Sequence, residues 1–221
     1  MLDRKTVAKT LVHRQARVQP GEVVVVRGGL HFTDLVEEIA VEVRKAGGSP
    51  QVRLTWERLD LRLVNEVPEE HLGRTPEHRV TEVGLVDAYI SLAPYADPKV
   101  LAAVEPGRSR LLSEASAPVR EARVARGARA IYAGYPTEAQ AALYGLSFAR
   151  FHEMFWEAAF ADPDRISDLC AAVRERLPGA GRVEVHSPTG ERLRFSILSR
   201  RINMDDGIIS DEDLASGDIT A

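Results

Sequence analysis

The chain has 221 residues, of which 44% are hydrophobic and 28% are charged, so it can bury a core without disulfide or metal staples and lacks the composition of a disordered protein. Its formal net charge of −4 argues against nucleic acid as a partner, because binding the phosphate backbone requires a basic face. The sequence shows neither a signal-peptide pattern nor an apolar stretch of ~20 residues, so we expect a cytoplasmic protein with no membrane partner.

The N-terminal part predicts a helix followed by a buried strand. Apolar residues recur at helical spacing over residues 3–17, and Pro20 and Gly21 stop that run. The β-branched run at 22–27 is too short for a helix and is apolar on both faces. Such a run is typical of a strand buried inside a parallel sheet.

A second helix and strand complete a βαβ unit. The glycine pair at 28–29 ends the first strand, and Thr33 and Asp34 are candidate N-caps of a helix that ends at the glycines 47–48. Residues 51–54 predict the second strand. Because βαβ crossovers are right-handed, we expect the two strands to be parallel neighbours.

The alternation of strands and helices continues along most of the chain, which predicts an α/β fold with a parallel sheet. The further elements expected are a polar helical stretch at 69–83, a strand at 86–92, helices at 97–104 and 109–127, a strand at 130–133, a helical region opened by Tyr135-Pro136-Thr137-Glu138, and helices at 147–160 and 164–177.

The pattern changes near residue 180. Residues 182–187 and 191–198 alternate strictly between polar and apolar, with a turn between them, which predicts an antiparallel hairpin with one face in water. We therefore expect an N-terminal α/β domain at 1–180 and an incomplete second domain at 181–221. A lone hairpin is marginally stable, and the acidic tail does not supply further strands.

No complete catalytic or metal-binding constellation is visible. Cys170 is expected on the inner face of a helix, without the electropositive setting of a reactive thiol. His71, His78, His152 and His186 lack the spacing of zinc ligands and are expected to be surface or packing residues. We therefore predict no catalytic residue and no metal ligand in this chain.

His31 is a candidate substrate-binding residue. It follows the glycine pair at the carboxyl end of the first strand, where open α/β sheets bind ligands. A solvated loop histidine is the alternative. The glycines occupy the place of a phosphate-binding loop, but a tight turn explains them equally, and no phosphate-loop motif is present.

Tyr135 and Thr137 are the other candidate substrate-binding residues. With Tyr132 and Pro136 they form a cluster at a strand end, where a hydroxyl would lie at the mouth of a cleft. The alternative is a helix N-terminus with aromatic packing. The acidic residues after 203 are a weaker candidate for a divalent cation, against the alternative of a solvated loop.

Several segments share the order and spacing of one family. They are Ala8–Val12, the Pro-Gly-Glu strand entry at 18–25, the Ala-Gly-Gly-Ser-Pro step at 46–52, residues 86–90, the Tyr-Pro-Thr segment at 135–141, and 151–159 followed by Asp162. Together they resemble the thermophilic metallo-aminopeptidases of the aminopeptidase T type.

This resemblance implies a two-domain peptidase that forms homodimers. The second domain would carry two divalent metals, Zn or Co, which would activate water and polarise the carbonyl of the N-terminal peptide bond. The first metal-ligating glutamate of the family lies in a segment like Asn-x-Pro-x-Gly-Glu after a hairpin. Residues 206–218 lack that segment, and the residues around Glu212 do not match it. The metals are therefore expected only in a full-length parent.

Three hypotheses follow. In the first, the chain is the N-terminal part of a metallo-aminopeptidase-like protein whose parent releases N-terminal residues from peptides, and the fragment itself is inactive. In the second, it is a standalone non-catalytic α/β module for ligand binding or assembly, with a site near His31, residues 93–95 and Tyr135. In the third, it is a nucleotide-dependent enzyme that uses the turn at 28–29.

Overall fold

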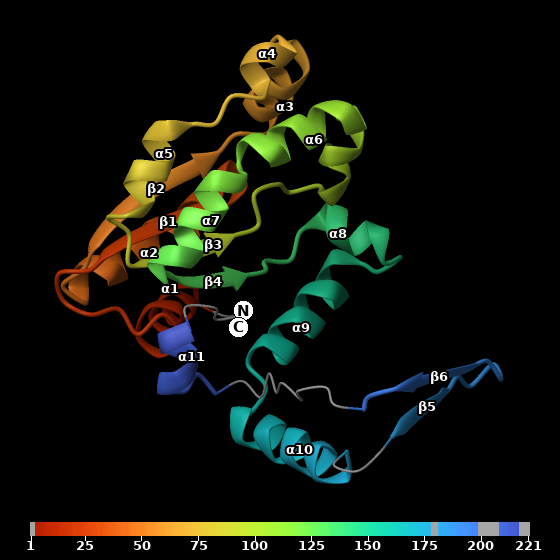
Figure 1. Cartoon of the computed structure of the whole chain (residues 1–221). Coiled ribbons are helices and arrows are strands. Elements are labelled where there is room, and N and C mark those ends of the chain that lie inside the picture. Colours follow the sequence, from red (N-terminus) through yellow and green to blue (C-terminus); the bar gives the residue numbers. More distant parts are fainter. Residues whose placement is uncertain (1–2, 178–180, 199–207, 217–221) are drawn as a thin grey trace. The chain divides into compact units, whose positions relative to one another are not determined.

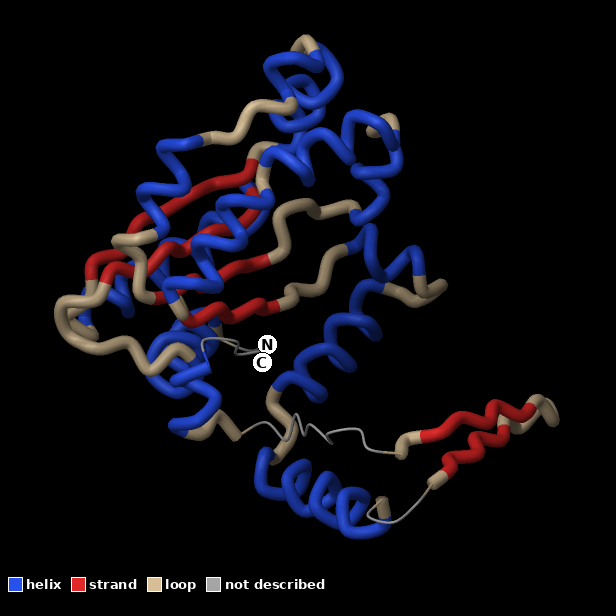
Figure 2. Tube along the Cα trace, viewed as in Figure 1, coloured by secondary structure: helices blue, strands red, loops and turns tan. Residues whose placement is uncertain are grey.

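The computed structural model describes residues 3–177, 181–198 and 208–216 (Figures 1 and 2). The chain forms two compact units, one of Met1–Ala159 with Ile209–Ala221 and the other of Phe160–Ile208. The predicted domain boundary near residue 180 is not where these units divide, and it stays a prediction.

The first unit is built on a four-stranded parallel sheet with the order β2-β1-β3-β4 (red in Figure 2). The strands are β1 (Val23–Gly29), β2 (Ser49–Thr55), β3 (Ala88–Leu92) and β4 (Arg129–Ala133). The sheet confirms the predicted α/β fold, and β1 and β2 are parallel neighbours as expected. β2 lies at one edge, where Pro50 pairs with Val24.

The two central strands explain the apolar runs in the sequence. All five residues of β3 are buried, and Val24, Val25 and Val26 of β1 are fully buried. Their side chains alternate between two separate cores, because successive residues of a strand point to opposite faces. Val24 and Val26 belong to one core and Val25 to the other.

One face of the sheet is covered by the helices that flank β1 in the sequence. These are α1 (Arg4–Lys9), which continues as a π-helical segment to Gln15, and α2 (Thr33–Lys45). The predicted helix at 3–17 is thus confirmed, with a wider final turn. Its apolar side chains, Leu11 and Val12 among them, join the core that contains Val24.

The predicted N-caps of α2 are wrong. Thr33 is already the first helical residue, and the preceding residue, Phe32, makes no side-chain capping bond. The physical reason is the short 3₁₀ turn at Leu30–Phe32, which leads directly into the helix. The backbone of Thr33 therefore has helical angles, and an N-cap residue requires extended ones.

The opposite face carries α5 (Glu77–Val83) and α7 (Ala117–Arg126), which lie in front of the sheet in Figure 1. α3 (Glu57–Glu66) and α4 (Glu69–Leu72) precede α5, and α6 (Pro106–Ala115) precedes α7. The single helix expected at 109–127 is divided at Ser116, because Pro118 has no N–H to donate to the preceding turn. The helix expected at 97–104 is a 3₁₀ segment, Pro98–Ala103, and α3 was not expected.

The first unit also contains α8 (Glu138–Leu143), α9 (Phe148–Ala159) and α11 (Asp211–Ser216). The second unit contains α10 (Pro163–Arg176) and the antiparallel hairpin of β5 (Arg182–His186) and β6 (Arg192–Ser196). The hairpin confirms the predicted antiparallel region, with Val183 opposite Phe195. The tail residues 203–207 and 217–221 lie outside the described residues. None of the described helices is long and apolar enough to cross a membrane.

Arg108 on α6 holds the end of α3. Its Nε donates to the Val64 carbonyl at 2.5 Å, another guanidinium N–H donates to the Val67 carbonyl, and its side chain is only 15% exposed. One side chain thus satisfies two carbonyls that would otherwise lose their partners at the helix terminus.

We predict that Arg108→Met lowers the free energy of unfolding by about 1–3 kcal/mol. The Val64 and Val67 carbonyls would lose their hydrogen-bond donor, and a desolvated carbonyl without a donor destabilises the folded state. Arg110→Met on the same helix is the matched control, since its pair with Glu114 is exposed and contributes about 0–1 kcal/mol. Urea unfolding of both variants measures the difference, and equal losses would contradict the assignment.

Candidate functional site

The candidate site lies outside the carboxyl ends of β1 and β3. The chain passes from β1 to β2 on one side and returns to place β3 on the other side of β1. In an open parallel sheet, such a reversal leaves a crevice between the two loops at the carboxyl ends of the strands. Here those loops begin at Gly28-Gly29 and at Ala93-Pro94, and the Gly29 N–H donates to the Ala93 carbonyl at 3.2 Å.

Gly29 is required by close approach of the two loops. A Cβ atom at this position would lie 2.5 Å from the Pro94 carbonyl oxygen and still closer to the ring of His31. The backbone angles of Gly29 are open to any residue, with φ at −69°. The glycine therefore serves packing, and its N–H is already engaged by Ala93 rather than directed at a phosphate.

His31 lies on the 3₁₀ turn after β1, with its ring centroid 3.6 Å from that of Phe32. Its side chain remains exposed, yet partial burial lowers the pKa of His31. Near neutral pH the imidazole is therefore uncharged, with one ring nitrogen as a donor and the other as an acceptor. A neutral histidine at this edge is suited to contact a polar ligand.

Tyr135 joins His31 in one aromatic cluster. The Phe32 ring lies 4.6 Å from the Tyr135 ring, and Tyr135 meets Trp156 of α9 edge-on at 5.4 Å. The Trp156 indole N–H donates to His152 at 3.0 Å. Two of the three predicted substrate-binding residues are thus brought together through Phe32, which sequence reasoning did not single out. Contact of either with substrate stays a prediction.

Thr137 caps α8. Its hydroxyl accepts from the Gln140 backbone N–H at 3.2 Å and donates to the Ala96 carbonyl at 2.7 Å, and the residue is 9% exposed. The Gln140 side-chain oxygen in turn accepts a hydrogen bond from the Thr137 N–H, which completes a capping box. The capping residue expected here is confirmed. Its hydroxyl is committed to the fold, and its predicted contact with substrate remains untested.

Asp60 and Tyr95 form a pair that sequence reasoning missed. The Tyr95 hydroxyl donates to an Asp60 carboxylate oxygen at 3.3 Å. Burial raises the pKa of Asp60, although the bond from Tyr95 acts in the opposite direction. Asp60 lies on α3, the helix that was not expected, so only the fold reveals that it meets the loop after β3.

The described residues do not offer a metal centre, because no group of three or more His, Cys, Asp or Glu side chains among them could hold a metal ion. In the described part of the acidic tail, Asp211 pairs with Arg17 at 2.7 Å, and Asp213 accepts bonds from Ser210. Asp205, Asp206 and Asp218 lie outside the described residues.

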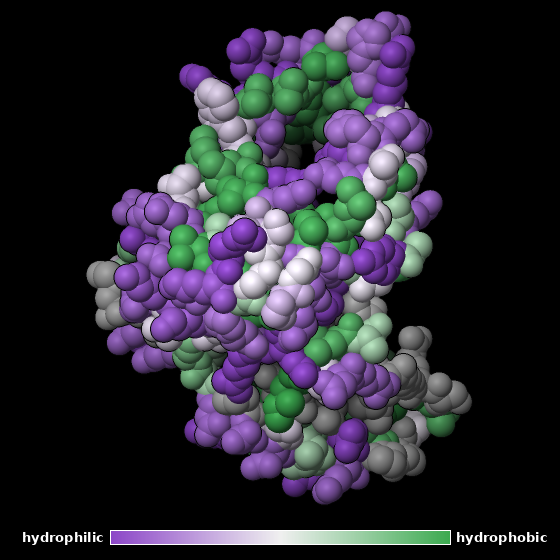
Figure 3. Space-filling view, turned by 90° about the vertical axis from the view of Figure 1, so that its left-hand side faces the viewer, coloured by the Kyte–Doolittle hydropathy of each residue, from purple (hydrophilic) through white to green (hydrophobic). Residues whose placement is uncertain are grey.

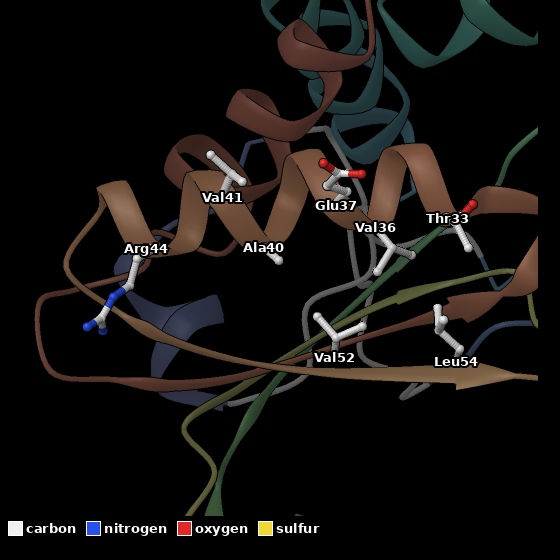
Figure 4. Close-up of a pocket in the computed structure, with 8 residues that line it drawn as sticks. All are labelled: Thr33, Val36, Glu37, Ala40, Val41, Arg44, Val52 and Leu54. Atoms are coloured by element: carbon white, nitrogen blue, oxygen red, sulfur yellow. The ribbon is translucent and has the colours of Figure 1, made fainter.

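An apolar groove of about 390 Å³ lies between α2 and the edge strand β2. Figure 4 shows Val36 and Ala40 on the underside of α2, facing Val52 and Leu54 of β2. Figure 3 shows further hydrophobic patches within a mainly hydrophilic surface. The groove offers a hydrophobic surface but no group suited to acid–base chemistry at its centre.

Comparison with known proteins identifies relatives. The family model of the thermophilic metalloproteases (M29) matches residues 3–167. The solved structure of wild-type AmpT from Thermus thermophilus has a similar fold, with a TM-score of 0.60 and 16% sequence identity. That similarity covers 86% of this chain and 57% of AmpT, so the chain spans little more than half the length of that protein. No curated protein matches the chain.

We predict that Gly29→Ala lowers the free energy of unfolding by about 1–3 kcal/mol, the usual cost of overpacking. The double variant with His31→Ala should recover only part of this loss, because the Pro94 carbonyl still obstructs the new methyl group. Gly73→Ala is the control, since its Cβ would meet no atom closer than 3.5 Å. Chemical denaturation compares the variants, and full recovery in the double variant would contradict the backbone clash.

A pH dependence follows from His31. Its pKa is lower in the folded chain than the value of about 6.5 in an unfolded one, so protonation favours unfolding. The stability that neutral His31 contributes is fully present above about pH 6.5, the pKa of an unfolded histidine. It is lost as the pH falls through the lower pKa of His31 in the folded chain. Thermal unfolding at about pH 7.5 and 5.5 should show a smaller loss of Tm for His31→Gln than for the unmodified chain. An equal or larger loss in the variant would rule this out.

Proposed function

The chain belongs to the thermophilic metalloprotease family (M29), and from this we propose that it forms the N-terminal α/β part of a metal-dependent aminopeptidase-like protein. The full-length parent would release N-terminal residues from peptides, and the 221-residue chain would itself be inactive. The observation that carries the proposal is the family match over residues 3–167, which includes nearly all of the first compact unit.

The metal ions belong to the proposed parent. The described residues do not fit a two-metal centre, because they contain no cluster of ligating side chains. Two divalent ions, Zn or Co, are what the family resemblance implies for the longer protein. The chain's own contribution would be structural, with the surface around His31 and Tyr135 contacting the peptide.

The neutral state of His31 supports this role for the surface around it. An uncharged imidazole can donate to a peptide carbonyl or accept from an amide N–H, and the His31 side chain is exposed, with its Nδ1 edge toward Gly29. Tyr135 is held against Phe32 and Trp156 and is half-buried. Tyr135 would therefore shape the surface that contacts the peptide and would not take part in the reaction. Thr137 would act through the position of α8, since its hydroxyl is already bonded.

The homodimer and the cytoplasmic location are part of the same proposal. The dimer is supported by the family resemblance and by exposed apolar side chains such as Val52 and Leu54. The location is supported by the single cysteine. The net charge of −4 supports peptides rather than nucleic acid as partners.

A second candidate function is a non-catalytic α/β module for ligand binding or assembly. The reversal of strand order between β1 and β3 supports it, because open parallel sheets bind ligands at such a point. The nucleotide hypothesis is weakened, because the Gly29 N–H that would face a phosphate is bonded to Ala93.

The test compares the 221-residue chain with the protein found in its source cells. We expect the purified chain to hydrolyse no aminoacyl p-nitroanilide above background with added Co²⁺ or Zn²⁺. An antibody raised against the chain should isolate a longer protein from cells, and that protein should have peptidase activity that a chelator abolishes and the metal restores.

Two outcomes would overturn this reading. Metal-dependent turnover by the pure 221-residue chain would show that the fragment is active. A native protein of the same 24.3 kDa mass and without peptidase activity would exclude the parent enzyme and favour the non-catalytic module.

A further inference from the structure

A second cavity, of about 270 Å³, lies between the sheet and the helices α5 and α7. Its floor contains arginines of β1 and β2, and its walls carry arginines of α5 and α7. Five arginines line it: Arg27, Arg53, Arg79, Arg120 and Arg123. They come from four elements, so they approach the cavity from several directions.

The strand register places the floor of the cavity in one row. Arg27 of β1 pairs with Arg53 of β2 on one side and with Ser91 of β3 on the other, and Ser91 pairs with Tyr132 of β4. Side chains at paired positions lie on the same face of a sheet. The row Arg53–Arg27–Ser91–Tyr132 therefore crosses all four strands beneath α5 and α7.

The row continues the face on which Val25 and Tyr89 form the smaller core. Phe32 of the aromatic cluster packs in the other core, together with Val24 and Val26. The arginine cavity and the aromatic cluster around Phe32 thus belong to opposite faces of the sheet.

Few negative charges balance these arginines. Among the residues that the structure describes, only Glu82 forms an ion pair with any of the five, through Arg53. Arg27 donates instead to the Ser91 hydroxyl at 2.7 Å, and Arg123 donates to the Tyr132 hydroxyl at 2.8 Å. Neutral hydroxyl groups satisfy hydrogen bonds but leave the positive charge uncompensated.

Two of the five guanidinium groups, those of Arg27 and Arg123, lie over an aromatic ring. Arg27 and Arg123 lie 5.9 Å and 5.8 Å from the ring centre of Tyr89, which is 5% exposed. Burial lowers the pKa of Arg27, and the charges of Arg123 and Arg79 lower it further. An anion in the cavity would relieve this repulsion, because an opposite charge favours the charged form of arginine.

We propose that this cavity binds a small multivalent oxyanion of the phosphate class, either inorganic phosphate or a small phosphate monoester. A carboxylate presents one edge of two oxygens, which a single guanidinium fork satisfies. A tetrahedral phosphate presents oxygens in several directions, which matches donors on both the floor and the walls. The volume lies just below the ~300–1,000 Å³ range of small-molecule pockets, so the ligand is small.

The test is calorimetric titration of the whole 221-residue chain with inorganic phosphate and with glycerol phosphate, at constant ionic strength set by chloride. We expect saturable binding of one anion per chain. Arg123→Gln and Arg79→Gln should each weaken binding at least tenfold. Both change residues on helices at the cavity wall, so they carry the test even if Arg27→Gln fails to fold, and circular dichroism checks that each variant is folded.

The control variant is Arg150→Gln, which removes the same charge from an exposed position on α9 outside the cavity. It should bind phosphate as the unmodified chain does. The two arms identify the ligand: tighter binding of glycerol phosphate indicates a monoester, and tighter binding of phosphate indicates the free ion. The proposal fails if no saturable binding is seen, if Arg150→Gln weakens binding as much as Arg123→Gln does, or if malonate binds more tightly than either phosphate.

Discussion

The enclosure of β1, whose residues Val24, Val25 and Val26 are fully buried, is the constraint on which the rest of the first unit depends. This strand has a neighbour along each edge, β2 and β3, and a hydrophobic core against each face. A strand in that position must be apolar on both faces, as Val24, Val25 and Val26 are. It must also end where two loops meet, and Gly29 makes that meeting possible because no side chain separates it from Pro94. The contact between these loops and the position of the arginine cavity are therefore both consequences of how one strand is enclosed.

Much of this fold was accessible from the sequence, because local pattern and burial agree there. The run of valines predicted β1, and the glycines predicted the breaks around it. Two errors arose where the backbone changed its course. Pro118 divided the expected helix at 109–127, and the 3₁₀ turn at Leu30–Phe32 displaced the cap of α2. α3 was also missed; its Val64 is buried, whereas Leu59 and Leu63 are partly exposed and belong to neither core of the sheet.

The candidate sites were less accessible, because they depend on contacts between distant segments. His31 and Tyr135 were chosen for their places at strand ends, yet it is Phe32 that joins them. Thr137 was chosen for its hydroxyl, which the fold uses for α8 and the Ala96 carbonyl. The arginine row could not be predicted at all without the register. Arg27, Arg53 and Arg123 lie far apart in the chain, and only strand pairing and helix packing place them around one cavity.

Pro50 on the edge strand has a consequence for how copies of this chain can meet. The Ser49 N–H donates inward to the Glu22 carbonyl, so at the next position the N–H would point away from the sheet. Proline has none, and the outer edge of β2 therefore lacks a donor at its beginning. A strand added from another molecule would lose that bond, which protects the open edge against continuous sheet growth. Association through side-chain surfaces such as the apolar groove remains compatible with this edge, whereas extension of the sheet from copy to copy is disfavoured.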